Sequence, residues 1–168
     1  MGRTGTLSLA LALARLGYKT AHWTEMVEQT DDKWTIPDEM FEEYDAFADG
    51  PMPLYYEYLM EDKSAKFILT MRDPHGWLES IERHWGKQRP AEGKKKLLRE
   101  KLYGTASFNH NKLWKAFTHH MIDVVNTVPS DRLLIMDITK GDGYARLCPF
   151  LGKEPKNEEF PHCNRGRR

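Results

Sequence analysis

The residues Gly2-Arg3-Thr4-Gly5-Thr6 could bind an anion, because they combine two glycines, two hydroxyls and one fixed positive charge. Successive backbone N–H groups in a glycine-containing turn can point at one negatively charged ligand, and a following helix adds its own N-terminal N–H groups. Arg3 would add a cation, and the hydroxyls of Thr4 and Thr6 would add donors. The same residues also suit an ordinary helix start with a threonine cap, so both interpretations stay open at this point.

A second group with anion-binding chemistry lies in ILTMRDPHGWLESIERHW, where Arg72 follows an apolar run and Ser80 comes eight residues later. Asp73 and Pro74 predict a turn into a helix, which places Ser80 about two helical turns inside it. An arginine can bind a phosphate through two hydrogen bonds, and a serine can donate another. The alternative is that Arg72 pairs with Asp73 or Glu79 and that Ser80 is a helix-surface residue.

The glycine turn lacks the pattern of a nucleotide-binding loop that works with magnesium. Such a loop reads GxxxxGK[ST], with the lysine on the terminal phosphates and the Ser or Thr hydroxyl on the metal ion. No Gly-Lys-Ser or Gly-Lys-Thr occurs in the chain. The sequence also lacks HExxH, and the neighbours His119 and His120 would project from different sides of a helix. These observations disfavour a small kinase and indicate no metal site.

Helices and strands alternate along the chain, and both anion-binding groups fall where a helix begins. The spacing of Leu7, Leu11 and Ala14 predicts a helix that ends at Gly17. Strands are predicted for residues 18–23, 45–49, 66–71 and 133–136, and further helices for residues 36–44, 52–60, 74–85, 111–125 and 144–151. In the helix at 52–60, Leu54 and Tyr58 are expected to face the core. This order predicts an α/β domain with a mostly parallel sheet, in which ligands bind at the carboxyl ends of strands.

The bulk composition fits one globular domain over residues 1–168, since 40% of the residues are hydrophobic. Lysine plus arginine and aspartate plus glutamate each number 25, which argues against a protein that works on bulk nucleic acid or an anionic membrane. The stretch LSLALALARLG is too short for a membrane span and contains Arg15. No signal peptide is clear. Cys148 and Cys163 do not form CxxC, so a reduced, cytoplasmic setting is expected.

Several collinear stretches together resemble the sulfotransferases that use 3′-phosphoadenosine 5′-phosphosulfate (PAPS). More narrowly, they resemble the branch that opens with (G/P)RTGTxSL, which includes bacterial sulfotransferase-like proteins and the drug-activating sulfotransferase of schistosomes. The matching stretches are GRTGTLSLALALARLGY, ADGPMPLYYEYL, AKFILTMRDPHGWLESI, TVPSDRLLIMDI and DGYARLCPFLGKEP with FPHCN. Each is short, but their order and spacing cover most of the chain. The resemblance implies a P-loop-like three-layer α/β domain.

The resemblance also implies how the PAPS donor would be held. The loop Arg3-Thr4-Gly5-Thr6 would cradle the 5′-phosphosulfate, and Ser8 would assist from the helix. Arg3 stands where cytosolic sulfotransferases place a lysine that stabilises the departing bridging oxygen.

Four further positions receive roles by the same resemblance. Arg72 and Ser80 match residues that grip the 3′-phosphate of the donor and of its product, 3′,5′-phosphoadenosine (PAP). Asp49, in ADGPMP, matches the acidic residue that serves this branch as catalytic base. Cytosolic sulfotransferases use a histidine instead, which makes His22 the reserve candidate. The alternative role for Asp49 is a turn-former before Gly50-Pro51.

The chain departs from the family pattern at three places. Relatives usually carry an apolar strand before the RTGT turn, whereas only Met1 stands here, so we expect the sheet with its first strand missing. Residues 86–112, which include the basic run GKKKLLREK, would form a lid beside the acceptor pocket or a solvated helix face. Residues 156–168 are expected to be a coil tail, and its arginines Arg165 and Arg167 match the family only weakly.

Taken together, the sequence predicts a PAPS-dependent sulfotransferase that moves a sulfuryl group to a hydroxyl or amine of a small-molecule acceptor. Positioning and cationic stabilisation should matter most, by analogy with phosphoryl transfer. One alternative is a non-catalytic or truncated relative that still binds PAPS or PAP. A small P-loop nucleotide kinase is a weaker alternative. The sequence identifies neither the acceptor nor the oligomeric state.

Overall fold

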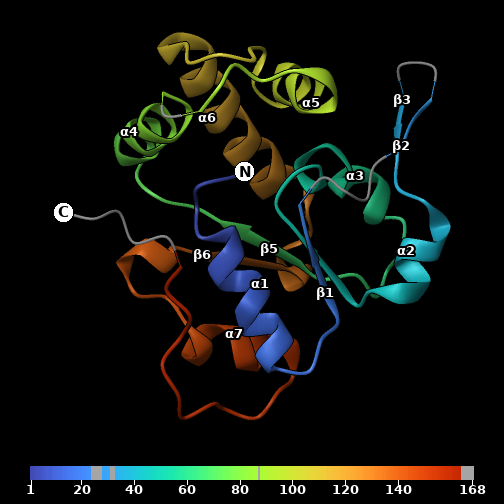
Figure 1. The fold of residues 1–168 in the computed structure, drawn as a ribbon. Helices are drawn as coiled ribbons and strands as arrows, with labels where there is room; N and C mark the ends of the chain where they lie inside the picture. Colours follow the sequence, from blue (N-terminus) through green and yellow to red (C-terminus); the bar gives the residue numbers. More distant parts are fainter. Residues whose placement is uncertain (24–27, 31–32, 87, 164–168) are drawn as a thin grey trace.

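The structure is a computed structural model that describes residues 1–23, 28–30, 33–86 and 88–163 (Figure 1). The α-helices of this part of the chain are α1 (Thr6–Arg15), α2 (Asp38–Glu43), α3 (Tyr56–Leu59), α4 (Pro74–Trp85), α5 (Gly93–Tyr103), α6 (His110–Thr127) and α7 (Tyr144–Leu151). The strands are β1 (Thr20–His22), β2 (Glu28–Thr30), β3 (Lys33–Thr35), β4 (Ala46–Ala48), β5 (Phe67–Thr70) and β6 (Leu133–Met136). Short 3₁₀ turns are η2 (Met52–Leu54), η3 (Ser130–Arg132) and η4 (Ile138–Lys140).

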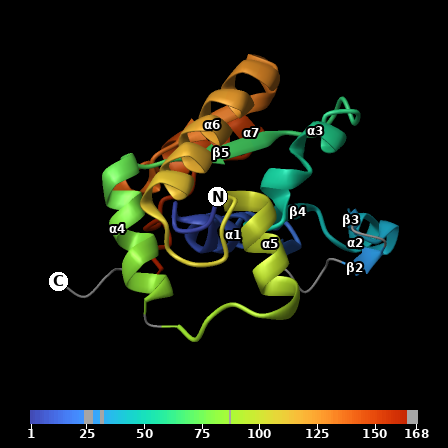
Figure 2. The same ribbon diagram turned by 90° about the horizontal axis from the view of Figure 1, so that it is seen from above.

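The predicted order of elements is confirmed, and the differences are local. The helix expected at residues 52–60 is split into η2 and α3, because Pro51 and Pro53 interrupt the backbone hydrogen bonding there. A helix, α5, occupies much of the segment at residues 86–112. The antiparallel hairpin of β2 and β3 was not predicted. Figure 2 shows this hairpin at the edge of the molecule beside α2, away from the other helices.

The α/β class with parallel strands is confirmed, but the strands form short separate pairs. β1 pairs with β4 in parallel, with His22 opposite Ala48. β5 pairs with β6 in parallel, with Thr70 opposite Met136. No hydrogen bonds join these two pairs into one sheet within the described residues. In the described chain β1, which follows α1, is the first strand.

Helices cover both faces of the β5–β6 pair, which gives three layers. Ile68 and Leu134 pack toward α1 and α7 in one core cluster. Their neighbours Leu69 and Ile135 pack toward α6 in another. This alternation follows from the two-residue repeat of a strand, and apolar side chains on both faces explain why these runs are almost continuously apolar.

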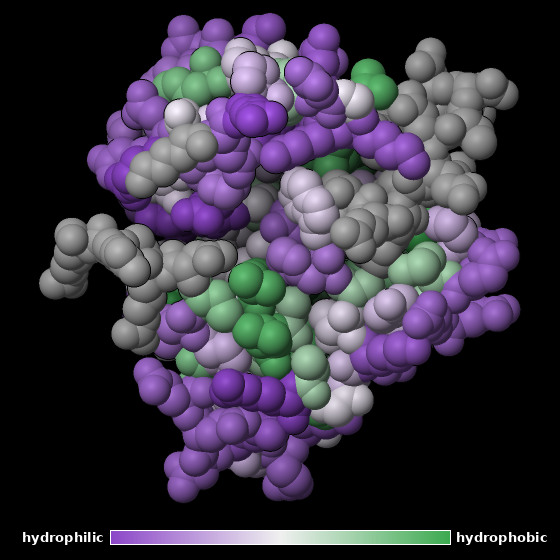
Figure 3. All heavy atoms as spheres, viewed as in Figure 1, coloured by the Kyte–Doolittle hydropathy of each residue, from purple (hydrophilic) through white to green (hydrophobic). Residues whose placement is uncertain are grey.

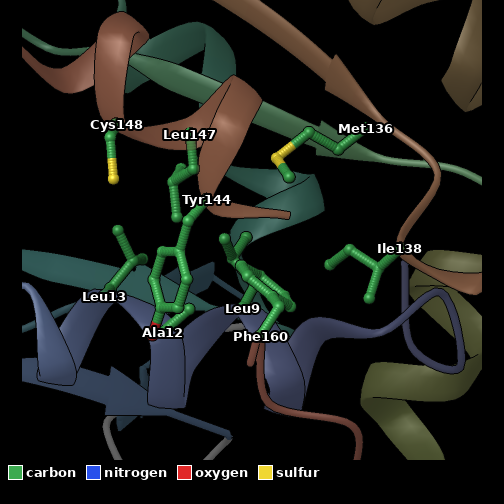
Figure 4. Packing of buried hydrophobic residues seen from close by; sticks show 9 residues of the cluster. All are labelled: Leu9, Ala12, Leu13, Met136, Ile138, Tyr144, Leu147, Cys148 and Phe160. Carbon is green, nitrogen blue, oxygen red and sulfur yellow. The ribbon is translucent and has the colours of Figure 1, made fainter. Parts of the chain in front are cut away.

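The core below the sheet joins the first helix to the end of the described chain. Figure 4 shows the side chains of α1, β6, η4 and α7 meeting around Phe160. The buried members of this cluster are Leu9, Ala12, Leu13, Met136, Ile138, Tyr144, Leu147, Cys148 and Phe160. Burial of these side chains fixes the direction in which α1 leaves the loop before it.

A second core lies among α4, α5 and α6, on the other side of the chain start (Figure 1). Trp77 of α4 is fully buried and stacks on Phe117 of α6, with ring centroids 4.4 Å apart. Met1 belongs to the same cluster. Residues 2–5 therefore connect the core of α4, α5 and α6, which contains Met1, to the core around α1.

The inward faces of two helical segments differ from what their sequence spacing suggests. In α1 the buried apolar residues include Leu9 and Leu13, whereas Leu11 is 43% exposed. Figure 3 shows apolar side chains on the surface over α1. Because this helix is apolar nearly all round, its spacing alone could not select the inward face. Leu54 and Tyr58 are exposed as well, since the split of that segment removes the single helical repeat on which the prediction rested.

Candidate functional site

The loop at residues 2–5 has the backbone geometry of an anion-binding turn. Arg3 and Gly5 both have positive φ, at 69° and 98°. Gly5 is also the N-cap of α1, where no side chain caps the first-turn N–H groups. Those N–H groups therefore remain for a ligand or for water. A Cβ on Gly5 would lie 3.1 Å from Cβ of Ile138, so glycine is required at this position by both conformation and space.

Two buried hydrogen bonds hold this loop from below. The side chain of Thr4 is fully buried, and its hydroxyl donates to the carbonyl oxygen of Met1 at 2.7 Å. Because Thr4 has one hydroxyl proton, Thr70 at the end of β5 must be the donor in the 2.6 Å contact between the two hydroxyls. The Thr4 side chain thus fastens the loop to a strand, and only its backbone could contact an anion.

A third hydrogen bond holds the loop from above. The indole Nε1 of Trp77 donates to the carbonyl oxygen of Gly2 at 2.9 Å. Since Trp77 is packed in the core of α4, α5 and α6, this bond connects the loop to that core. The loop is therefore tied to both halves of the molecule.

Arg3 connects the loop to both residues of the second predicted group. Its Nε donates to Oγ of Ser80 at 3.1 Å, and its carbonyl oxygen accepts from Arg72 at 3.3 Å. Nε of Arg72 is buried and has no hydrogen-bond partner among the described residues. Burial lowers the pKa of Arg3, and the positive charges of Arg72 and Arg83 lower it further. An anion placed between these cations would relieve their repulsion and give Arg72 its missing partner.

Asp49 lies beside the first turn of α1. It follows β4, and its Oδ2 accepts a hydrogen bond of 2.8 Å from the hydroxyl of Thr6. Its Oδ1 accepts one of 2.8 Å from the N–H of Gly50. His22, at the end of the adjacent strand β1, places Nε2 3.5 Å from Oδ2 of Asp49. The parallel pairing of β1 with β4 brings these two side chains together, as the carboxyl ends of neighbouring parallel strands meet at one edge.

Asp49 stays ionised at neutral pH despite its burial. Burial by itself raises the pKa of this carboxyl, but the contacts with His22 and Thr6 and the N–H of Gly50 act in the opposite direction. Together they hold the pKa of Asp49 below its usual range. The site therefore presents one partly buried negative charge close to a loop suited to anions.

Ser8 connects α1 to the last described residues. It is buried on α1, and its Oγ accepts a hydrogen bond of 2.9 Å from the backbone N–H of Cys163. Residues 156–163, the described part of the coil tail expected at residues 156–168, contain no helix or strand, and they reach the first turn of α1 at Cys163. Arg165 and Arg167 lie outside the described residues.

One cavity of about 1100 Å³ brings most of these groups together. Of the residues predicted for the site, those that line it are Arg3, Gly5, Thr6, Ser8, His22, Asp49, Arg72 and Ser80. Thr4 does not line it, because its side chain points into the core. The volume slightly exceeds that of an ordinary small-molecule site, which gives room for two ligands at once.

The other wall of this cavity includes part of residues 86–112, which the sequence offered as a lid beside the acceptor pocket, but the sequence did not indicate which side chains form the wall. Its side chains come from the end of α4 and from α5, and they are Ile81, Arg83, His84, Trp85, Lys95, Leu98, Arg99, Leu102 and Tyr103, with Gln88 between the two helices. The basic run in α5 could be recognised in the sequence, but its spacing did not show which of its positive charges face the cavity. Burial raises the pKa of Tyr103, so this phenol stays protonated.

The described residues contain neither a metal-binding cluster nor a membrane-spanning helix. No group of three His, Cys, Asp or Glu residues in the described part of the chain could hold a metal ion. No helix within the described ranges is both long enough and apolar enough to cross a membrane.

Comparison with known proteins agrees with the chemistry of this cavity. A family model described as "Sulfotransferase domain" matches residues 1–168. The chain is also similar to "Ava biosynthesis cluster protein M" of Aspergillus versicolor, with 28% identity over an alignment of 201 residues. That alignment covers 95% of this chain and 76% of the fungal protein.

Proposed function

Since the chain belongs to the sulfotransferase domain family, we propose that it moves a sulfuryl group from PAPS to a hydroxyl or amine of a small-molecule acceptor. The observation that supports this most directly is the hydrogen bond between Thr6 and Asp49, which joins the anion-binding loop to a partly buried carboxylate. Donor and base are needed within one site for this reaction, and this contact brings their residues together.

Two groups of residues would hold the two anionic ends of the donor. The backbone of residues 2–5 and the first turn of α1, with Ser8, would take the 5′-phosphosulfate. Arg72 and Ser80 would take the 3′-phosphate, and the unpartnered Nε of Arg72 suits that role. In the described structure the guanidinium of Arg3 donates a hydrogen bond to Ser80. On donor binding, this guanidinium would turn away from Ser80 and toward the bridging oxygen. PAPS would supply a sulfuryl group already bonded to a phosphate leaving group.

Asp49 would act as the general base, with His22 as the alternative. The acceptor oxygen or nitrogen would form a bond to sulfur while the bond from sulfur to the 5′-phosphate breaks. The acceptor proton would pass to Asp49, and the cations around the loop would stabilise the negative charge on the leaving phosphate. The acceptor ends as a sulfate ester or sulfamate, and PAP is the second product.

The cellular setting belongs to the same proposal. We place the reaction in the cytoplasm, because the described cysteines Cys148 and Cys163 are both free.

Thermal-shift measurements with three ligand conditions test the proposal most cheaply. We expect PAP without metal to raise the melting temperature, because the loop and Arg72 need no cation to bind it. ATP alone and ATP with magnesium should raise it less. Stabilisation by ATP only when magnesium is present would contradict the proposal and favour a kinase. Stabilisation by PAP, with no turnover of any acceptor, would favour a non-catalytic binding protein.

A further inference from the structure

The wall of the cavity formed by α5 contains a cluster of cations that the donor does not use. Nζ of Lys95 donates to Oε1 of Gln88 at 2.9 Å, and the guanidinium of Arg99 donates to the same oxygen at 2.8 Å. Nε2 of Gln88 lies 2.8 Å from Nε2 of His84, which makes His84 the acceptor and therefore neutral at that nitrogen. One amide oxygen thus accepts hydrogen bonds from two positive charges.

Arg99 is held firmly in this position. It is 7% exposed, and its guanidinium lies over the ring of Trp85, 4.0 Å from the centroid. A second hydrogen bond runs to the carbonyl oxygen of Ala106 at 3.3 Å. A guanidinium stacked on an aromatic ring keeps its edge available for a planar acceptor, and a carboxylate matches that edge best.

The described residues do not neutralise the positive charge of this wall. Among the described residues that line the cavity, Asp49 carries the only carboxylate, and it interacts with Thr6, Gly50 and His22. No ion pair of Lys95 or Arg99 occurs within the described ranges. Burial lowers the pKa of Lys95, and the charge of Arg99 lowers it further, which is the expected effect of two uncompensated cations.

The position of α5 indicates which ligand would reach this cluster. A Cβ on Gly50, the residue after Asp49, would lie 3.2 Å from Cδ2 of Leu98, so α5 packs directly against the segment that carries the base. The donor's anionic groups are assigned to the loop and to Arg72, on other elements. A molecule lying along α5 would meet the apolar side chains of Leu98 and Leu102 between the base and the cations.

We propose that Lys95 and Arg99, which Gln88 now bridges, bind a carboxylate on the acceptor, so that the substrate class is a small apolar acid bearing a hydroxyl or amine. This inference rests on the proposed sulfuryl transfer and deepens it. The carboxylate would replace the Gln88 oxygen as the acceptor between the two cations, which is favourable because it adds a negative charge to hydrogen bonds whose donors are already positive, and its two oxygens match the guanidinium edge.

Matched acids and methyl esters test this inference. The probes are 4-hydroxybenzoate, 4-hydroxyphenylacetate and the methyl ester of each, titrated calorimetrically into the full chain with and without saturating PAP. We expect at least one acid to bind about 10-fold more tightly than its ester, as the loss of a hydrogen bond to a charged group requires. Lys95→Gln should reduce that ratio to about 3-fold or less. Gln88→Glu should abolish it, because it places a carboxylate between the same cations.

Lys96→Gln is the matched control, since it removes the same charge from an exposed position of the same helix. It should leave the acid-to-ester ratio unchanged. Equal binding of acids and esters, or a ratio that both cluster variants leave intact, would overturn the inference. So would a loss of PAP affinity in Lys95→Gln as large as that in Arg72→Ala, because the cluster would then serve the donor. Failure of PAP to bind would count against the proposed function, while the acid-to-ester comparison without PAP still tests the cluster.

Discussion

Arg3 and Ser80, which are 77 positions apart in the sequence, are joined by a hydrogen bond of 3.1 Å between Nε and Oγ. The contact connects the loop before α1 to the middle of α4. It also places the loop arginine next to the residues assigned to the other end of the donor. The two predicted anion-binding groups therefore form one continuous surface, and Arg3 of the first group makes the contacts with Arg72 and Ser80 of the second.

Arg72→Ala should weaken PAP much more than adenosine 5′-phosphosulfate, which lacks the 3′-phosphate. We expect the dissociation constant for PAP to rise about 10- to 150-fold, the effect of losing a hydrogen bond to a charged group, and that for the smaller ligand less than about 3-fold. Ser80→Ala should raise the dissociation constant for PAP only about 2- to 10-fold. Calorimetric titration of both ligands measures this. Equal losses for the two ligands would mean that Arg72 acts by supporting Arg3 and the loop, to which it donates a hydrogen bond.

Asp49→Asn should lower kcat by about 10²- to 10⁴-fold while the affinity for PAP changes less than about 3-fold. The amide keeps the shape of the side chain but cannot take a proton. Because the pKa of Asp49 lies below its usual range, the wild-type rate should stay flat as the pH falls from 8 to about 5. Rate measurements across this range with both variants, Asp49→Asn and His22→Asn, check the assignment. A wild-type rate that falls through the neutral range, together with a larger loss in His22→Asn, would make the histidine the base.

The ionised Asp49 should also stabilise the fold in a pH-dependent way. Its folded pKa lies below that of the unfolded chain, so its contribution is fully present above about pH 4 and is lost as the pH falls through the folded value. Asp49→Asn should therefore be less stable than wild type at pH 7, by about 1–3 kcal/mol, and the difference should shrink at pH 3. Urea unfolding at the two pH values measures it. A difference that stays constant would show that the charge of Asp49 contributes nothing to stability.

Gly5→Ala should destabilise the protein more than Gly17→Ala. Both glycines have positive φ, at 98° and 91°, so both variants pay about 1–2 kcal/mol of backbone strain. A Cβ at Gly17 meets nothing within 4 Å, whereas one at Gly5 meets Ile138 at 3.1 Å, which adds about 1–3 kcal/mol. Urea unfolding and PAP titration of both variants compare them. We expect only Gly5→Ala to lower the affinity for PAP. Equal destabilisation by the two variants would show that η4 can move aside to make room for the added Cβ.

Thr4→Val should cost about 1–3 kcal/mol of unfolding free energy, although it keeps the shape of the side chain. It leaves the Met1 carbonyl and the Thr70 hydroxyl without their buried partner. Thr4→Val with Thr70→Val should cost less than the sum of the single changes, because the two hydroxyls are paired with each other. Thr118→Val serves as control, since its hydroxyl contacts only carbonyls of its own helix. Additive costs for Thr4 and Thr70 would contradict a shared hydrogen bond.

Much of the fold followed from local patterns. The apolar runs at residues 66–71 and 133–136 predicted β5 and β6, and the segment around Asp73-Pro74 predicted the start of α4, where Asp73 caps the helix by accepting from the N–H of Gly76 at 2.6 Å. These signals succeeded because each depends on residues close in sequence. The inward faces of α1 and of the 52–60 segment could not be predicted in this way, because the partners that bury them come from distant elements.

At the site, residue types and strand-end positions could be predicted from the sequence. The motifs and the resemblance pointed to Arg3, Gly5 and Arg72 as anion-binding residues and to Asp49 as the candidate base. The sequence could not show that the Thr4 hydroxyl is hydrogen-bonded inside the core or that Arg3 bonds to Ser80. Nor could it show that Lys95 and Arg99 face the cavity while Lys96 faces solvent. These contacts arise in the folded chain, because hydrogen-bond pairing and burial depend on which distant elements pack together.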